Sequence, residues 1–182
     1  MSASTRNIPA SSQTVGPYFR IGLQHLIDAV PQVRQNSGVT IRGRVLDSNG
    51  APVTDAMLEV WSPACGTTSS SDAFPLGFRR VGTDLNGTFT IALPRPKPGP
   101  LGFEDGLSQA PHFLVLVFAR GLLRHLITRL YLDDEPSNAL DPVLLSVPGD
   151  RRKTLIAHSE QPDIFRWDVI LQGIDETVFF AW

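Results

Sequence analysis

The residues of this chain that could bind a metal ion or transfer a proton are few and stand apart from one another. The four histidines are His25, His112, His125 and His158. Their spacing fits neither H-x-H nor H-E-x-x-H, the local patterns that bring two imidazoles onto one metal ion. No G-x-S-x-G segment indicates a nucleophilic serine, and no glycine-rich loop is placed to bind a phosphate group. We therefore expect each histidine to lie at the surface or to be hydrogen-bonded in the core.

Charge and hydropathy exclude several classes of protein. The 182 residues include 16 Lys and Arg against 18 Asp and Glu, a formal net charge of -2. A nucleic-acid-binding protein usually carries a basic excess, so we expect no nucleic-acid partner. The most apolar run, Phe113 to Ala119, is much shorter than the roughly 20 residues that cross a bilayer, so we expect no membrane contact. The start lacks an apolar secretion signal and Cys65 is the single cysteine, which predicts a cytoplasmic location.

Apolar and polar residues alternate along much of the chain, a pattern typical of β-strands. The strands predicted from this pattern are 39–45, 56–61, 88–93, 113–118, 126–132, 165–171 and 177–180. The turn at Asn49-Gly50 predicts that the first two are a hairpin or neighbouring strands. Strand 113–118 is apolar on both faces, as expected in the middle of a sandwich. Helix is confined to 22–29 and 136–140, so the sequence predicts an all-β sandwich.

Two segments outside the predicted core indicate contact with another chain. Residues 1–36 form a polar N-terminal arm with a short helix, and residues 37–182 form the β-sandwich domain. The segment 94–100 alternates proline with other residues, which makes it stiff and poor in N–H donors. We expect the N-terminal arm to contribute to partner contact.

Four segments, taken in order, identify a family. They are Ser12-Gln13-Thr14-Val15-Gly16-Pro17-Tyr18, Ala110-Pro111-His112-Phe113, Thr128-Arg129-Leu130-Tyr131 and Gln172-Gly173-Ile174-Asp175-Glu176-Thr177-Val178-Phe179-Phe180. From Ser12 to Phe180 the chain resembles the intradiol ring-cleaving dioxygenases, and among them the alpha subunits of protocatechuate 3,4-dioxygenases. The resemblance implies a transthyretin-like β-sandwich that assembles with a homologous beta subunit into an alpha-beta hetero-oligomer.

The resemblance also implies a cofactor, Fe(III), which the beta subunit binds through two tyrosines and two histidines. At that iron, protocatechuate is opened by O2 to 3-carboxy-cis,cis-muconate. Fe(III) is a hard cation that prefers anionic oxygen, and coordination stabilises phenolate over phenol. In this chain the matching histidine positions are Leu114 and Leu116, one tyrosine position is Leu101, and the other falls in a tyrosine-free loop at 65–69. We therefore expect no catalytic residue and no metal ligand here, and no activity from this chain alone.

Five residues are expected to line the substrate pocket. The resemblance implies that the pocket of the partner's iron is covered by Thr14, Gly16, Pro17 and Tyr18. Pro17 fixes the backbone there, and Gly16 permits close approach. Tyr18 has an alternative role, holding the arm against the sandwich. Arg129 is the fifth.

On the predicted strand 126–132, Ile127, Arg129 and Tyr131 share one face, opposite the leucines. The guanidinium of Arg129 suits the carboxylate of protocatechuate, because its planar fork can donate two parallel hydrogen bonds. Its alternative role is a structural or interface ion pair, for example with Asp133 or Asp134.

Two other functions remain open from the sequence. One is a free-standing β-sandwich binding module without iron, since fold does not fix function. The other is an iron enzyme with different ligands, for example His112 and His125 together with a carboxylate.

Overall fold

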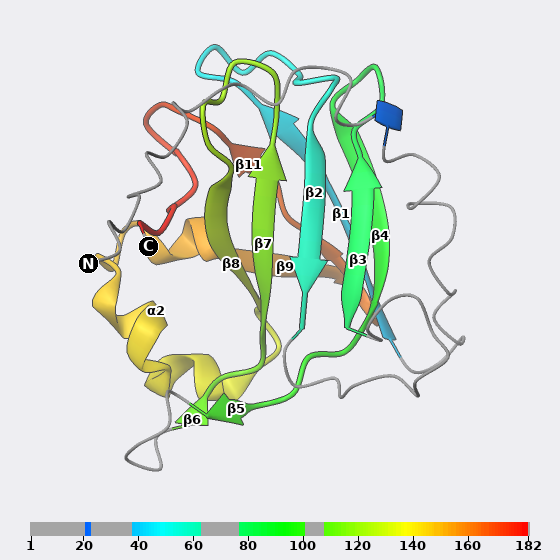
Figure 1. The fold of residues 1–182 in the computed structure, drawn as a ribbon. Helices are drawn as coiled ribbons and strands as arrows, with labels where there is room; N and C mark the ends of the chain where they lie inside the picture. Colours follow the sequence, from blue (N-terminus) through cyan, green and yellow to red (C-terminus); the bar gives the residue numbers. More distant parts are fainter. Residues whose placement is uncertain (1–20, 23–37, 63–76, 101–107, 182) are drawn as a thin grey trace, which may run out of the picture.

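Two β-sheets packed face to face make up the computed structural model, which describes residues 21–22, 38–62, 77–100 and 108–181 (Figure 1). One sheet has the strand order β3-β2-β7-β8 and is antiparallel throughout. Its strands are β2 (Met57–Trp61), β3 (Phe78–Gly82), β7 (His112–Phe118) and β8 (Leu126–Leu132).

The second sheet is built around β1 (Gly38–Leu46), which pairs antiparallel with β4 (Thr88–Pro94) and parallel with two later strands. These are β10 (Ile164–Arg166) and β11 (Val169–Ile170), and β9 (Ile156–Gln161) follows beyond β10. A short parallel contact between β8 and β9 joins the two sheets along one side. The predicted all-β sandwich is confirmed.

Short elements close the ends of the sandwich. A small hairpin of β5 (Gly99–Pro100) and β6 (Ser108–Gln109) lies below β7 in Figure 1. Beside β8 run the 3-10 helix η2 (Pro136–Leu140), the helix α2 (Pro142–Ser146) and the 3-10 helix η3 (Arg152–Leu155). The predicted helix at 136–140 is confirmed as η2. The predicted helix at 22–29 and the arm at 1–36 lie almost wholly outside the described residues.

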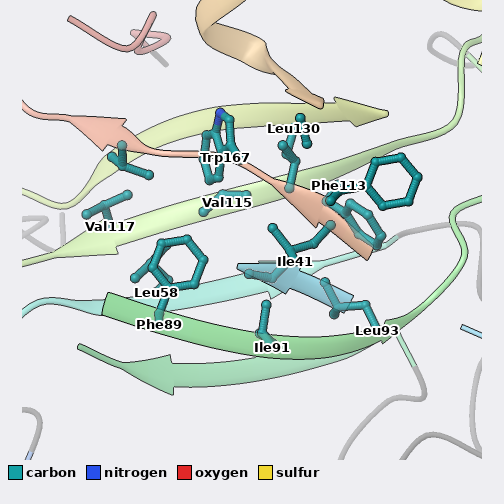
Figure 2. Close-up of a cluster of buried hydrophobic side chains, with 14 of the residues drawn as sticks. Ile41, Leu58, Phe89, Ile91, Leu93, Phe113, Val115, Val117, Leu130 and Trp167 are labelled. Atoms are coloured by element: carbon teal, nitrogen blue, oxygen red, sulfur yellow. The ribbon is translucent and has the colours of Figure 1, made fainter. Parts of the chain in front are cut away.

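The core fills the space between the sheets, and Figure 2 shows side chains from both sheets meeting there. The inward residues of β1, such as Ile41, and of β4, such as Ile91, pack toward Phe113 and Val115 of β7. These positions follow the period-two alternation of each strand, because successive side chains point to opposite faces. In β7 the alternation is clear: Phe113, Val115 and Val117 are fully buried, whereas the outward leucines between them are only partly buried.

One glycine is required where β1 meets the chain after β10. A Cβ at Gly43 would lie 1.7 Å from the backbone oxygen of Trp167 and 3.0 Å from the ring of Phe89. The close approach lets the N–H of Trp167 donate to the carbonyl of Arg42 at 2.9 Å. Gly43 therefore permits the parallel pairing that seats the Trp167 ring in the core.

Three predictions about strands are wrong. The segments 39–45 and 56–61 form no hairpin, because β4 and β10 flank β1 while β2 lies in the other sheet. The predicted strand 165–171 is split into β10 and β11. Between them, the side-chain carboxylate of Asp168 accepts a hydrogen bond from the backbone N–H of Arg44 at 2.9 Å, in place of a strand contact. Segment 177–180 is not a strand, because its backbone N–H groups donate to separate elements instead of one neighbouring strand. The N–H of Val178 donates to the hydroxyl of Thr154 at 3.2 Å, and the N–H of Phe180 donates to the carbonyl of Ile127 at 2.8 Å.

Candidate functional site

The outer face of β7 and β8 carries buried polar side chains that could bind a ligand. Three cross-strand pairs lie on this face: His112 with Tyr131, Leu114 with Arg129, and Leu116 with Ile127. The neighbours Leu130 and Leu132 point to the opposite face and belong to the core. The expectation that Ile127, Arg129 and Tyr131 share one face is therefore confirmed.

Arg129 is buried on this outer face, with only 7% of its surface exposed. Its Nη1 donates to Oε1 of Gln109 at 2.6 Å and to the hydroxyl of Tyr131 at 3.3 Å. Its Nε is fully buried and has no hydrogen-bond partner in the described part of the chain. Both identified acceptors are neutral, so a guanidinium sits in a desolvated position without a carboxylate in direct contact among the described residues.

Asp141 is the nearest negative charge in this network, and it reaches Arg129 through Tyr131. The hydroxyl of Tyr131 donates to Oδ1 of Asp141 at 3.1 Å. The same carboxylate accepts from the backbone N–H of Leu144 at 2.7 Å and of Ala110 at 2.8 Å. Asp141 is 1% exposed and is the N-cap of α2, which fixes its position.

His112 packs against the ring of Tyr131. Its Nδ1 is 2.8 Å from the carbonyl oxygen of Ala110, and its ring centroid is 5.6 Å from that of Tyr131. Burial, reinforced by the charge of Arg129 and opposed by the Ala110 hydrogen bond, lowers the pKa of His112 below its ordinary 6.5. Burial also raises the pKa of the Tyr131 hydroxyl, so this group is protonated at neutral pH and can donate to Asp141.

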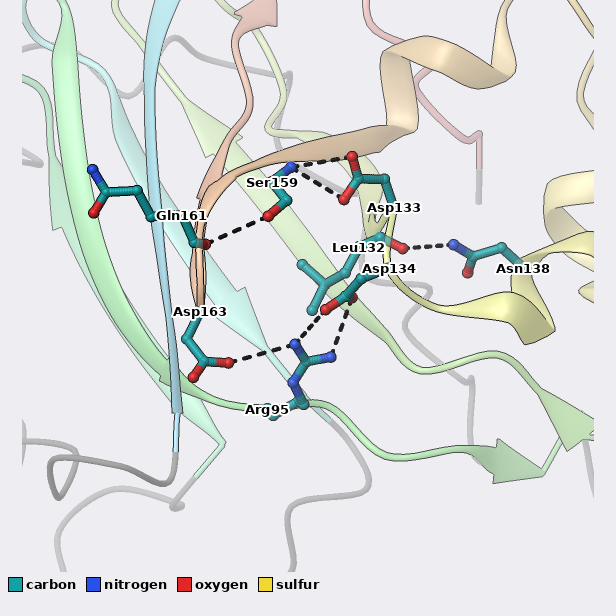
Figure 3. A network of polar contacts seen from close by, with 8 residues as sticks. All are labelled: Arg95, Leu132, Asp133, Asp134, Asn138, Ser159, Gln161 and Asp163. Atoms are coloured by element: carbon teal, nitrogen blue, oxygen red, sulfur yellow. Dashed lines mark hydrogen bonds and ion pairs between the residues drawn. The ribbon is translucent and has the colours of Figure 1, made fainter.

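Arg129 forms no ion pair with Asp133 or Asp134, and both carboxylates have other partners (Figure 3). Asp133 accepts from the backbone N–H of Ser159 at 3.1 Å and lies 3.3 Å from the ring of His158. Asp134 pairs with Arg95 at 2.6 Å.

The described residues do not fit an iron site. Among residues 21–22, 38–62, 77–100 and 108–181, no three His, Cys, Asp or Glu side chains converge to bind a metal ion. On β7, His112 is followed on the same face by Leu114 and Leu116, which offer no ligand atoms. An iron site built on His112 and His125 is wrong, because His125 packs on Phe118 at the far end of β7, at 5.4 Å between rings.

The remaining predicted pocket residues, Thr14, Gly16, Pro17 and Tyr18, lie outside the described residues, as do Leu101 and the loop at 65–69. Their roles stay predictions. Gln109 and Asp141 were not identified from the sequence. The only local signal for Asp141 is the pair Asp141-Pro142, typical of a helix start, and it does not point to Arg129.

Within the described ranges, none of the helices combines the length and apolar character needed to cross a bilayer.

Comparison with known proteins gives the family. The sequence model of the dioxygenase family matches residues 16–173. The protocatechuate 3,4-dioxygenase alpha chain of Burkholderia cepacia is 40% identical, covering 93% of this chain and 95% of the relative. The beta chain from the same organism is 27% identical, covering 76% of this chain and 66% of its own length.

Among solved structures, the catechol 1,2-dioxygenase of Acinetobacter sp. ADP1 has the same fold. Its TM-score is 0.58 at 19% identity, with 81% of this chain and 57% of that chain covered. The match over most of the sequence, the 40% identity and the shared sandwich agree. The chain belongs to the intradiol ring-cleaving dioxygenase family.

Proposed function

We propose that this chain is the alpha subunit of a protocatechuate 3,4-dioxygenase and works in a complex with a homologous beta subunit. The 40% identity to an alpha chain over 93% of this chain supports the assignment. We propose that the ferric ion of the complex is bound by the beta subunit, because the described residues of this chain offer no cluster of ligands. The iron, when bound, would make the catechol ring reactive toward O2, and this chain would contribute groups that bind the substrate.

Arg129 carries the proposal that this chain binds substrate. A buried guanidinium loses its hydration, and that loss must be offset by hydrogen-bonded anions or strong acceptors. Arg129 has two neutral acceptors and a buried Nε without a partner in the described ranges. The carboxylate of protocatechuate, which plain catechol lacks, is an anion of the right geometry for this fork.

The N-terminal residues complete the proposed pocket. Thr14, Gly16, Pro17 and Tyr18 fall in or beside the start of the family match at residue 16. We assign them to the wall of the cleft, where Pro17 restricts the backbone and Gly16 allows close approach to the substrate.

Co-production of this chain with the beta subunit of its own organism tests the assembly. The complex should be coloured, contain iron and cleave protocatechuate, whereas the purified single chain should be colourless and inactive. Iron bound by the single chain, with ring cleavage, would overturn the proposal. A stable monomer that does not associate with the beta subunit would favour a free-standing binding module.

Substitution of Arg129 tests the substrate contact in that complex. Arg129→Ala should raise KM for protocatechuate by roughly 10- to 150-fold, the equivalent of about 1.5–3 kcal/mol for a hydrogen bond to a charged group. The KM for catechol should change little, because catechol has no carboxylate. Arg95→Ala is the control, since Arg95 is surface-exposed and pairs with Asp134. Equal losses for both substrates would make Arg129 structural.

A further inference from the structure

Arg129 is held by a chain of hydrogen bonds that ends on a buried carboxylate. We infer that Tyr131 and Asp141 are positioning residues, which orient the guanidinium of Arg129 toward the carboxylate of the aromatic substrate. This inference rests on the proposed function, because it assumes that Arg129 meets the substrate.

The guanidinium uses Nη1 for both identified contacts, at 2.6 Å to Gln109 and 3.3 Å to Tyr131. These two contacts hold one corner of the guanidinium and leave Nε buried without a hydrogen-bond partner in the described ranges. An anion that reaches Nε would therefore satisfy a donor that the described part of the fold leaves unpaired.

Tyr131 is anchored by Asp141. Its hydroxyl has one hydrogen, which goes to Oδ1 of Asp141 at 3.1 Å, so its lone pairs face Arg129. Tyr131 is fully buried, and its ring packs against the ring of His112 at 5.6 Å between centroids. The phenol oxygen therefore has little freedom to move away from the guanidinium.

The carboxylate of Asp141 is itself held in place by backbone groups. Asp141 accepts backbone hydrogen bonds from both sides, Ala110 just before β7 and Leu144 in α2. It is the N-cap of α2, so its side-chain orientation is set by the helix start. The carboxylate is then held at a fixed place one hydroxyl away from Arg129, and it makes no hydrogen bond to the buried Nε.

This arrangement differs from a direct ion pair in its consequence for binding. A carboxylate in contact with Arg129 would compete with the substrate for the same N–H groups. A neutral phenol between the two charges orients the guanidinium without neutralising it. Preorganisation of this kind lowers the entropic cost of binding.

The test uses the alpha-beta complex and the conservative change Tyr131→Phe, which removes the hydroxyl and keeps the ring. KM for protocatechuate should rise about five- to tenfold, as for loss of one hydrogen bond, with little change for catechol. Thr128→Val is the matched control: it removes another buried hydroxyl of β8, one that donates to the backbone carbonyl of Val178 at 2.7 Å. This hydroxyl makes only a long contact, 3.5 Å, with the backbone carbonyl of Arg129 and none with its guanidinium. This control should leave both KM values unchanged.

A double-mutant cycle separates positioning from a structural role. In the Arg129→Ala background, Tyr131→Phe should have no further effect on KM for protocatechuate, because the group it positions is gone. The same loss with and without Arg129, or an equal loss for catechol, would overturn the inference. Asp141→Asn, which removes the charge, should reproduce the selectivity of Tyr131→Phe.

A crystal structure of the Tyr131→Phe complex distinguishes failure of this inference from failure of the proposed function. Displacement of the Arg129 guanidinium supports positioning. An unmoved guanidinium overturns it. If Arg129→Ala has no selective effect on protocatechuate while the guanidinium is displaced in Tyr131→Phe, the substrate contact is wrong and the positioning of Arg129 stands.

Discussion

A single methyl group at Gly43 should destabilise the sandwich severely. The Cβ of Gly43→Ala would lie 1.7 Å from the carbonyl oxygen and 2.7 Å from the carbonyl carbon of Trp167. Both atoms belong to backbone, so β1 and the segment after β10 would have to separate by well over 1 Å. That shift breaks the hydrogen bond from the backbone N–H of Trp167 to the carbonyl of Arg42. It also strains the hydrogen bond from the Trp167 indole N–H to the carbonyl of Thr154; both are 2.9 Å long.

The magnitude follows from what is lost. Two hydrogen bonds cost about 1 kcal/mol each, and partial withdrawal of a tryptophan that is 4% exposed adds about 1–3 kcal/mol, for a total of roughly 3–5 kcal/mol. For a chain of this length, that corresponds to a fall in Tm of about 6–15 °C. Thermal unfolding of the alpha-beta complex, followed by circular dichroism, measures it.

Gly149→Ala provides the matched control. Nothing lies within 4 Å of a Cβ at Gly149, so its Tm should stay within about 2 °C of the parent. If Gly43→Ala unfolds at the same temperature as Gly149→Ala, the close approach of Trp167 to β1 is not as the structure has it.

Three further predictions concern pH, a buried hydroxyl and an exposed ion pair. Because the pKa of His112 is lowered below 6.5 in the folded chain, the unfolded chain binds a proton more readily. The stability contributed by neutral His112 should therefore be full above about pH 6.5 and fall as the pH drops below it. His112→Gln should flatten the fall in Tm measured from pH 7.5 to 5.5, and an equal fall in the variant would contradict this. Thr83→Val should lower the free energy of unfolding by about 1–3 kcal/mol in urea titrations, because a buried backbone N–H loses its acceptor at 3.0 Å, whereas the exposed Thr90→Val should be nearly neutral. Arg95→Ala should cost less than about 1 kcal/mol, since the side chains of Arg95 and Asp134 are each 40% exposed; a larger loss that persists in 1 M salt would refute this.

Strands with a regular alternation could be predicted from the sequence, and those without it could not. Strands β1, β4, β7 and β8 match their predicted ranges within a residue or two. Strand β9 was missed because only Ala157 of its six residues is buried, so it has no apolar face to recognise. Its pairing with β8 and β10 depends on neighbours that are distant in sequence.

The candidate site divides in the same way. Arg129 could be placed on the face of its strand opposite the leucines, because the alternation of side chains along a strand is local. Its partners could not be identified: Gln109 and Asp141 come from a short hairpin and a helix start, and each has an unremarkable local sequence.

Local alternation and family-like segments were therefore enough for the fold class and the family, since each is written in consecutive residues. The register between sheets and the meeting of Arg129, Tyr131 and Asp141 required the folded chain. A hydrogen bond forms only when two segments come within about 3 Å, and that distance is set by the packing of the whole sandwich.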